Sequence, residues 1–208
     1  QAYGFEFFFK KRIGKINGWI GYTLAWTTET FPDLNNGQTF YAKYDRRHDL
    51  SVVLNYQFSD RWTFSSVFVY GSGEALTMPV GWYIIEGTLV EEYGDRDGYR
   101  LAPYDRMDIA ATYTPNRQKM AERRQARWEA RMKKNGGQDT VYVDRRPTWM
   151  KNFHSSWTFS VYNVYNRYNP YFIYFDISGN VYNNSLNIQA KQVSLFPILP
   201  SVTWNFHF

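Results

Sequence analysis

The sequence VTWNFHF at residues 202–208 alternates apolar and polar side chains without a break. Side chains along a β-strand point to opposite faces with a period of two, so this stretch predicts a strand with one apolar and one polar face. Trp204, Phe206 and Phe208 share the apolar face. Three large aromatic side chains on one face are typical of a strand whose outer face meets lipid and whose inner face meets water.

The composition favours the same interpretation. The 208 residues include 18 Tyr, 16 Phe and 8 Trp, yet the mean hydropathy is negative. Transmembrane barrels combine interfacial aromatic residues with a polar interior. No stretch approaches the roughly 18 consecutive apolar residues of a membrane helix, which excludes helical spanning only. The absence of cysteine fits an oxidising compartment.

Alternating patterns predict seven strands. They lie at about residues 3–10, 20–27, 50–58, 62–68, 106–114, 157–161 and 187–208. The last segment contains Pro197 and Pro200, and we expect a bulge or irregularity there because proline cannot donate to a ladder. The stretch from Trp82 to Val90 could hold one further pair of strands.

The first four connections alternate in length. Residues 12–17 and 59–61 form short turns, whereas 28–44 and 71–103 form long loops. This alternation is typical of outer-membrane barrels, in which the short turns face the periplasm. Bacterial barrels need an even number of strands and no free edge, so seven strands predict the end of a larger barrel whose other strands precede Gln1.

The fifth connection, residues 116–153, breaks this alternation, because a short periplasmic turn is expected there. Residues 117–134 predict a helix that Gly136 and Gly137 end. The net charge of the chain is +5, and residues 115–151 alone carry +7. The helix is either a solvated helix in the periplasm or a basic amphipathic helix that docks on phospholipid or on an acidic periplasmic partner. Its candidate docking residues are Arg123, Arg124, Arg127 and Arg131. A nucleic-acid partner is not expected for a helix held between membrane strands.

Six motifs carry a resemblance to a known family. They are GWIGYTL at 18–24, YDRRHDL at 44–50, PYDRMD at 103–108, YNVYNR at 162–167, NPYFIY at 169–174 and KQVSLFPILPSV at 191–202. In their order and spacing the chain resembles the C-terminal barrel portion of TonB-dependent outer-membrane receptors, particularly the large Bacteroidetes group. The resemblance covers nearly all of residues 1–208.

The resemblance implies a 22-stranded barrel with an N-terminal plug, located in the bacterial outer membrane. Such receptors import scarce ligands with energy from the TonB complex, and many in this group have a surface lipoprotein lid. This chain would supply the last seven strands. Trp204, Phe206 and Phe208 would then form the terminus that barrel-insertion machinery reads. The insertion at 116–153 is longer than the usual turn of the family.

Two charged motifs echo each other where long loops enter strands. Asp45, Arg46 and Arg47 form the first, and Asp105, Arg106 and Asp108 form the second. A charge that faces lipid costs about 2–4 kcal/mol at mid-depth, so these side chains are expected at the lumen or the rim. They form either a ladder of ion pairs between strands or a site for an anionic ligand or the plug.

Five tryptophans lie near predicted strand ends: Trp19, Trp26, Trp62, Trp157 and Trp204. We expect them to anchor the barrel at the lipid headgroups.

Catalysis has little support in the sequence. His48, His154 and His207 are scattered without metal-ligand spacing, so neither a metal nor another cofactor is expected. Gly71-Ser72-Gly73 lacks the residues of a nucleophile elbow. We therefore expect a non-enzymatic import receptor. The alternative is a receptor-like scaffold whose partner lipoproteins carry the function.

Overall fold

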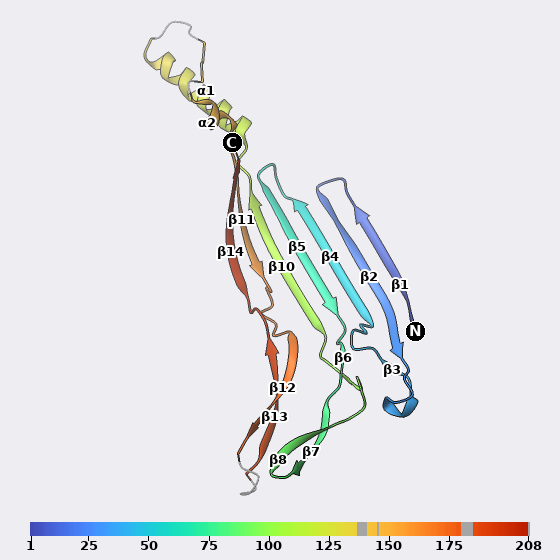
Figure 1. The fold of residues 1–208 in the computed structure, drawn as a ribbon. Helices are drawn as coiled ribbons and strands as arrows, with labels where there is room; N and C mark the ends of the chain where they lie inside the picture. Colours follow the sequence, from blue (N-terminus) through green and yellow to red (C-terminus); the bar gives the residue numbers. More distant parts are fainter. Residues whose placement is uncertain (137–140, 145, 180–184, 208) are drawn as a thin grey trace.

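A computed structural model describes residues 1–136, 141–144, 146–179 and 185–207. The structure is mostly β and its sheets are antiparallel (Figure 1). The main sheet contains β1 (Ala2–Lys11), β2 (Ile16–Glu29), β4 (His48–Gln57), β5 (Trp62–Gly71), β10 (Tyr104–Tyr113), β11 (His154–Tyr162) and β14 (Leu199–His207), and β3 (Phe40–Tyr41) pairs with the end of β2. The remaining elements are the short strands β6 (Ala75–Leu76) and β9 (Tyr99–Arg100), the hairpins β7 (Pro79–Ile85) with β8 (Thr88–Tyr93) and β12 (Pro170–Ser178) with β13 (Asn187–Ser194), the 3-10 helix at Asn35–Gly37, and the helices α1 (Arg117–Lys134) and α2 (Thr148–Asn152).

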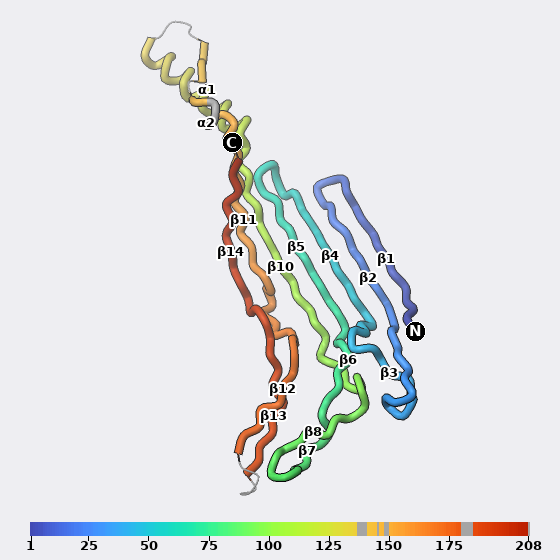
Figure 2. The backbone as a smooth tube through the Cα atoms, in the orientation of Figure 1, coloured from blue at the N-terminus to red at the C-terminus, as the bar shows by residue number. Residues whose placement is uncertain are grey.

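The seven long strands of the main sheet pair with their neighbours in chain order. Every pairing between them is antiparallel, so the chain runs back and forth across one sheet (Figure 2). Six of the seven predicted segments correspond to β1, β2, β4, β5, β10 and β11. Period-two alternation predicted them because each strand has two chemically different faces.

The prediction of one strand over 187–208 is wrong. That segment is two strands, β13 and β14, and residues 195–198 separate them. Phe196 has a φ of 51°, which no strand residue adopts. Side chains of the turn after β11 satisfy the interrupted backbone: Asn163 Nδ2 donates to the Phe196 carbonyl (3.2 Å), and Ile198 N donates to Asn166 Oδ1 (3.0 Å). The expected irregularity near Pro197 is therefore confirmed, and it divides the strand.

The two ends of the sheet carry different connections (Figure 1). The turns after β1 and β4 are short and lie at the same end as α1 and the end of β14. Gly14 allows the first turn, because its φ of 105° is open to glycine and strained for other residues. The hairpins β7–β8 and β12–β13 extend from the opposite end. The first four connections therefore alternate as predicted: the two short turns lie at one end of the sheet, and the two long loops lie at the other.

Two hairpins project beyond the main sheet. The stretch from Trp82 to Val90, which could hold a pair of strands, contains parts of both strands of the hairpin β7–β8. Strand β12 was not predicted, because consecutive apolar residues such as Tyr171 and Phe172 obscure any alternation, and its partner β13 was predicted only as the start of the segment 187–208. The rings of Trp82 and Phe175 lie 5.4 Å apart, so the two hairpins contact each other.

No second layer covers the main sheet among the described residues. The buried apolar side chains in this part of the chain are Phe40, Ala42 and Ala75 alone. These residues belong to the long connections, so the middle of the sheet lacks a conventional core. Within the described strands, β1 pairs only with β2 and β14 only with β11, so the sheet is open at both edges.

Candidate functional site

One face of the main sheet is apolar across all seven long strands. The pairing register shows this directly, because residues paired across an antiparallel ladder lie on the same face. One row of partners connects Phe9, Ile20, Val52, Phe68 and Met107 from β1 to β10. Another row connects Tyr56, Phe64, Ala111, Phe159 and Val202 from β4 to β14.

This face, the apolar face, is exposed to an unusual degree. Phe5 is 63% exposed, Phe9 56% and Val202 61%. A soluble monomer rarely leaves a contiguous apolar patch of more than a few hundred Å² in water. Because the face extends over seven strands, it needs a covering of lipid or protein.

An aromatic belt crosses the apolar face near the short turns. Trp62, Tyr113, Trp157 and Trp204 occupy one row of paired residues. The rings of Trp62 and Tyr113 lie 5.1 Å apart, and those of Trp157 and Trp204 lie 5.6 Å apart. Indole and phenol rings have an apolar body and a polar tip, which suits the boundary between lipid and water.

A second group of aromatic residues on the apolar face, Tyr3, Trp26 and Tyr70, lies toward the long loops. Tyr3 stacks on Trp26 at 5.4 Å, and the Arg47 guanidinium lies 4.9 Å from the Trp26 ring. In β5, Trp62 and Tyr70 lie eight residues apart on the apolar face. That separation is roughly 26 Å along a strand, or about 20 Å in depth at a typical tilt of about 40°. The spacing of the two groups is close to the ~25 Å apolar band of transmembrane barrels.

The tryptophans predicted as anchors divide between the two faces. Trp26, Trp62, Trp157 and Trp204 lie on the apolar face. Trp19 does not, because it pairs with Lys10 and Val53 on the opposite face and lies 5.8 Å from the Phe8 ring. Trp19 therefore lies on a different face of the sheet from the other four predicted anchors.

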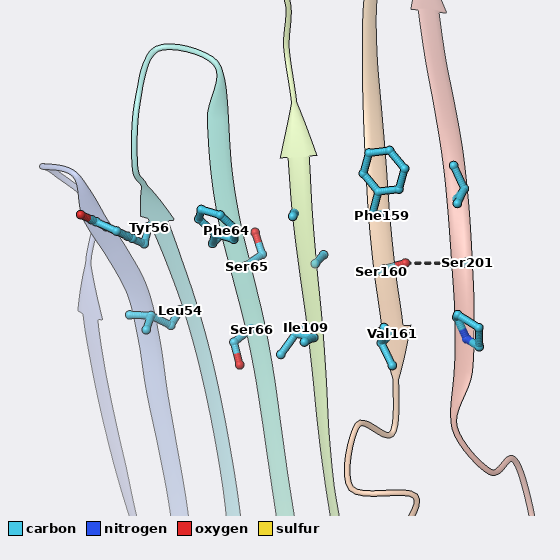
Figure 3. A pocket seen from close by; sticks show the side chains of 14 residues that line it. Leu54, Tyr56, Phe64, Ser65, Ser66, Ile109, Phe159, Ser160, Val161 and Ser201 are labelled. Carbon is cyan, nitrogen blue, oxygen red and sulfur yellow. Dashed lines mark hydrogen bonds between the residues drawn. The ribbon is translucent and has the colours of Figure 1, made fainter.

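A groove of about 610 Å³ lies on the apolar face between β4 and β14 (Figure 3). Its larger lining side chains include Leu54, Phe64, Ile109 and Phe159. Ser66 pairs with Leu54 and Ile109, and Ala111 pairs with Phe64 and Phe159. These two small residues leave space between their bulky neighbours.

The opposite face, the polar face, carries hydrogen bonds between strands. Asn55 donates to Asn17 (3.3 Å) and accepts from Ser65 (2.8 Å), so it links β2, β4 and β5. The Thr112 and Thr158 hydroxyls lie 3.0 Å apart. Those of Ser160 and Ser201 lie 2.7 Å apart. These contacts fix the register of the strands on the side where water or polar groups are tolerated.

Asp45 is the most buried charged residue at the long-loop end, with 1% exposure. Its carboxylate forms an ion pair with Arg100 and accepts a hydrogen bond from Thr27 N at 2.6 Å. Arg100 also donates to the carbonyls of Asp45 and Gly73, and its guanidinium lies 4.6 Å from the Tyr41 ring. The pair connects two long loops to the end of β2.

The other charges of the first motif have separate partners. Arg46 forms an ion pair with Glu74 at 2.7 Å and lies 3.8 Å from Asp49. Arg47 instead lies over the rings of Trp26 and Tyr41. The three charges of this motif therefore contact loop residues, Asp49 of β4 and aromatic rings.

The charges of the second motif also contact residues from distant segments of the chain. Asp105 forms an ion pair with Arg167 at 2.6 Å, and Asp108 accepts from Asn163 N at 2.9 Å. Arg106 donates to the Tyr162 hydroxyl (2.9 Å), and its Nε lies 3.1 Å from Asp108. Sequence reasoning missed these partners because they come from loops up to 64 residues away. Apart from Arg47, which lies over aromatic rings, each charge of the two motifs has an oppositely charged partner in this structure.

The basic helix α1 extends from the short-turn end. Its N-cap is Asn116, whose side chain accepts from Lys119 N at 2.9 Å. Arg123, Arg127 and Arg131 are exposed, whereas Arg124 is half-buried. Trp128 contacts Tyr142 at 5.7 Å between ring centroids, which connects the helix to the returning chain. The predicted helix at 117–134 is thus present with the expected bounds.

Below α1, Asp144 and Arg146 form a local ion pair of 2.6 Å. The Arg146 side chain donates to the carboxylate and lowers the pKa of Asp144 well below its usual range. The same contact raises the pKa of Arg146. The pair keeps both groups charged.

Comparisons with known proteins gave no match to a family model, a curated protein or a solved structure. Among the described residues, no helix is long and apolar enough to cross a membrane. In that part of the chain, no group of His, Asp or Glu side chains is arranged to hold a metal ion. Phe208, which the sequence analysis grouped with Trp204 and Phe206, lies outside the described residues, whereas the latter two lie on the apolar face of β14.

Proposed function

We propose that this chain forms membrane-spanning strands of an outer-membrane β-barrel. The observation that carries the proposal is the exposed apolar face, which crosses seven antiparallel strands and is backed by a hydrogen-bonded polar face. In a bilayer, the first face would contact acyl chains and the second would line the lumen. The two aromatic groups support lipid as the covering of the apolar face, because their spacing is close to the thickness of the hydrocarbon band.

A barrel also accounts for the two free edges. Strand edges with unpaired backbone groups are costly in lipid, so a membrane sheet must close on itself. Closure requires further strands between the free edges of β1 and β14. On this proposal, the short turns and α1 face the periplasm, and the hairpins β7–β8 and β12–β13 face the outside.

The resemblance in sequence makes a TonB-dependent import receptor the proposed class. The barrel would import a scarce ligand, with energy from the TonB complex acting on a plug in the lumen. The paired charges at the long-loop end would keep the loops in position above that lumen. Arg106 and its partner Tyr162 lie on the polar face, where a plug or ligand would pass.

Site-directed spin labelling tests the membrane assignment. The chain has no cysteine, so a single cysteine can be placed at each of residues 51–56 in turn and labelled in lipid vesicles. We expect labels at 52, 54 and 56 to be accessible to oxygen dissolved in lipid, and labels at 51, 53 and 55 to a water-soluble nickel complex. Equal accessibility of all six positions to the nickel complex would refute a membrane-spanning β4.

A second experiment tests the assignment of sides. Thr88→Cys lies in β8 of the outer hairpin, and Ala126→Cys lies in α1. In intact cells, a membrane-impermeant maleimide should label Thr88→Cys only. Ala126→Cys should react only after the outer membrane is permeabilised. The reverse result would invert the proposed orientation.

The exposed hairpins favour a second candidate function, a scaffold for surface lipoproteins. Val80, Ile84 and Ile85 in one hairpin and Tyr171 and Tyr174 in the other are exposed and apolar or aromatic. Such side chains suit a protein lid or a docked lipoprotein. If import is the function, cells that lack TonB and cells that lack this protein should both fail to grow when the same scarce nutrient is limiting. A scaffold would be independent of TonB, and its loss would lower the level of its partner lipoproteins.

A further inference from the structure

The base of α1 contains two adjoining hollows of about 270 and 500 Å³. Arg117, Arg124, Arg146 and His154 line both of them, and we call this region the cationic hollow. These residues come from α1, from the chain returning to α2 and from β11, so residues distant in sequence build one site.

The cationic hollow has more positive charge than its neighbours neutralise. Arg146 is paired with Asp144, but Arg117 donates to the His154 ring at 2.6 Å and forms no ion pair with an acid among the residues that the structure describes. Arg124 forms no ion pair within the described residues, and its Nε is shielded from solvent without a hydrogen-bond partner there. Buried donors of a guanidinium are costly to leave unpaired, so the hollow is suited to an anion.

Part of the wall of the smaller hollow, the one of about 270 Å³, is apolar. Met120, Met150 and Phe153 line it together with the arginines. The Phe153 ring lies 6.4 Å from that of Trp204 and 6.5 Å from that of Phe206. The apolar wall therefore continues into the aromatic belt and the apolar face of β14.

A path along β14 connects the hollow to the groove on the apolar face. Phe206 lies next to the hollow, and Val202, four residues earlier on the same face, lines the groove. Four residues span roughly 13 Å along a strand, and the hydrocarbon of one leaflet is roughly 15 Å thick. An acyl chain that starts at the hollow is long enough to reach the groove.

We propose that the cationic hollow and the groove form one binding site for an anionic phospholipid. Arg117 and Arg124 bind the phosphate, since guanidinium groups match phosphate oxygens with paired hydrogen bonds. Phe153, Trp204 and Phe206 contact the glycerol and upper acyl carbons, and the groove holds the end of one chain. This proposal rests on the membrane assignment above, because the acyl chain must lie along a lipid-facing surface.

Lipid binding can be measured with the complete protein in detergent by native mass spectrometry. The probes are phosphatidylglycerol, zwitterionic phosphatidylcholine and inorganic phosphate. We expect phosphatidylglycerol to bind more tightly than phosphatidylcholine, and inorganic phosphate not to displace it. Displacement by inorganic phosphate at equal concentration would show a site for free anions and would overturn the lipid proposal.

Two double variants with equal charge change distinguish the hollow from general attraction. Arg117→Gln with Arg124→Gln removes the half-buried arginines, and Arg123→Gln with Arg127→Gln removes exposed ones from the same helix. The first should weaken phosphatidylglycerol binding by roughly tenfold or more, through loss of charge-assisted hydrogen bonds, and the second by much less. Equal losses would indicate a diffuse basic surface, such as one for an acidic protein partner, and would overturn the proposal.

The groove has its own matched pair. Ala111→Phe fills the groove, whereas Ala25→Phe adds the same ring to the polar face of β2, away from the residues that line the groove. Only the first should reduce phosphatidylglycerol binding, and unchanged binding in a folded Ala111→Phe protein would remove the acyl-chain part. Spin-label accessibility along β4 separates the two proposals. If spin-label accessibility alternates along β4 but all variants bind phosphatidylglycerol equally, the lipid site is refuted and the membrane assignment stands. If accessibility does not alternate, the membrane assignment itself is refuted.

Discussion

Ser65 and Ser66 are the same amino acid in adjacent positions of β5, and the pairing register places them on opposite faces of the sheet. Ser65 donates to Asn55 on the polar face, next to Ala110. Ser66 lies between Leu54 and Ile109 on the apolar face, where it helps to form the groove. The difference between these two environments comes from the pleat of the strand and not from the residue type. The faces can therefore be tested with pairs of identical substitutions.

The largest expected effect comes from a charge at the middle of the apolar face. Ser66 lies midway between Trp62 and Tyr70, so Ser66→Arg should destabilise the membrane-embedded barrel by about 2–4 kcal/mol. The measurement is urea unfolding in lipid vesicles. Ser65→Arg is the control on the polar face, where the charge remains hydrated and the expected loss is about 1 kcal/mol from its hydrogen bond. Equal losses from the two variants would mean that the faces are not chemically distinct in the membrane.

The next effect concerns the buried charge at the long-loop end. Arg100→Gln leaves the Asp45 carboxylate without its cation, and we expect a loss of about 1–3 kcal/mol. Because Arg100 is about one-third exposed, the expected loss of stability is smaller than that for breaking a fully buried ion pair. Arg96→Gln, an exposed change in the same long loop, should alter stability little. Unfolding in urea and protease resistance of residues 72–103 would both report the difference.

Fluorescence quenching distinguishes the two classes of tryptophan. In proteins that retain a single tryptophan, brominated lipid should quench Trp157 strongly, because it lies in the belt of the apolar face. Trp19 should be quenched weakly, because it lies on the polar face beside Phe8. Strong quenching of both would place Trp19 in lipid and contradict the register as a guide to environment.

The smallest effect is local and depends on pH. The pKa of Asp144 is lowered in the folded chain, so the Asp144–Arg146 contact contributes stability above the ordinary carboxyl pKa of about 4 and loses it as the pH falls further. The order of the returning chain near Tyr142 should decrease accordingly. Fluorescence anisotropy of Trp128, which contacts Tyr142, measures it in a chain retaining only that tryptophan. Asp144→Asn should remove the pH dependence.

Much of the sheet could be predicted because alternation is a local property. Six strands, the hairpin at β7–β8 and the helix α1 follow from patterns within ten to twenty residues. Alternation also separates Trp19 from Trp26, because an odd spacing of seven residues places the two on opposite faces of one strand. Pairing confirms this: Ile20 lies beside Val52 on the apolar face, which turns Trp19 to the other.

The partners of the charged motifs could not be predicted. Asp45 and Arg100 are 55 residues apart, and Asp105 and Arg167 are 62 apart, so nothing local in the sequence connects them. The length of the loops and the order of the strands bring them together. The cationic hollow has the same origin, because Arg124 and Arg146 meet only when the insertion folds back on β11.

The sequence by itself determined that this protein has strands with one apolar and one polar face and that one connection carries a basic helix. Those features depend on the period of the strand and on helix propensity, which act over a few residues. Only the tertiary structure decided which strands are neighbours, that their apolar sides merge into one exposed face, and which charges are paired. Such contacts depend on register and loop closure between distant segments, and a one-residue shift in register would exchange the two faces.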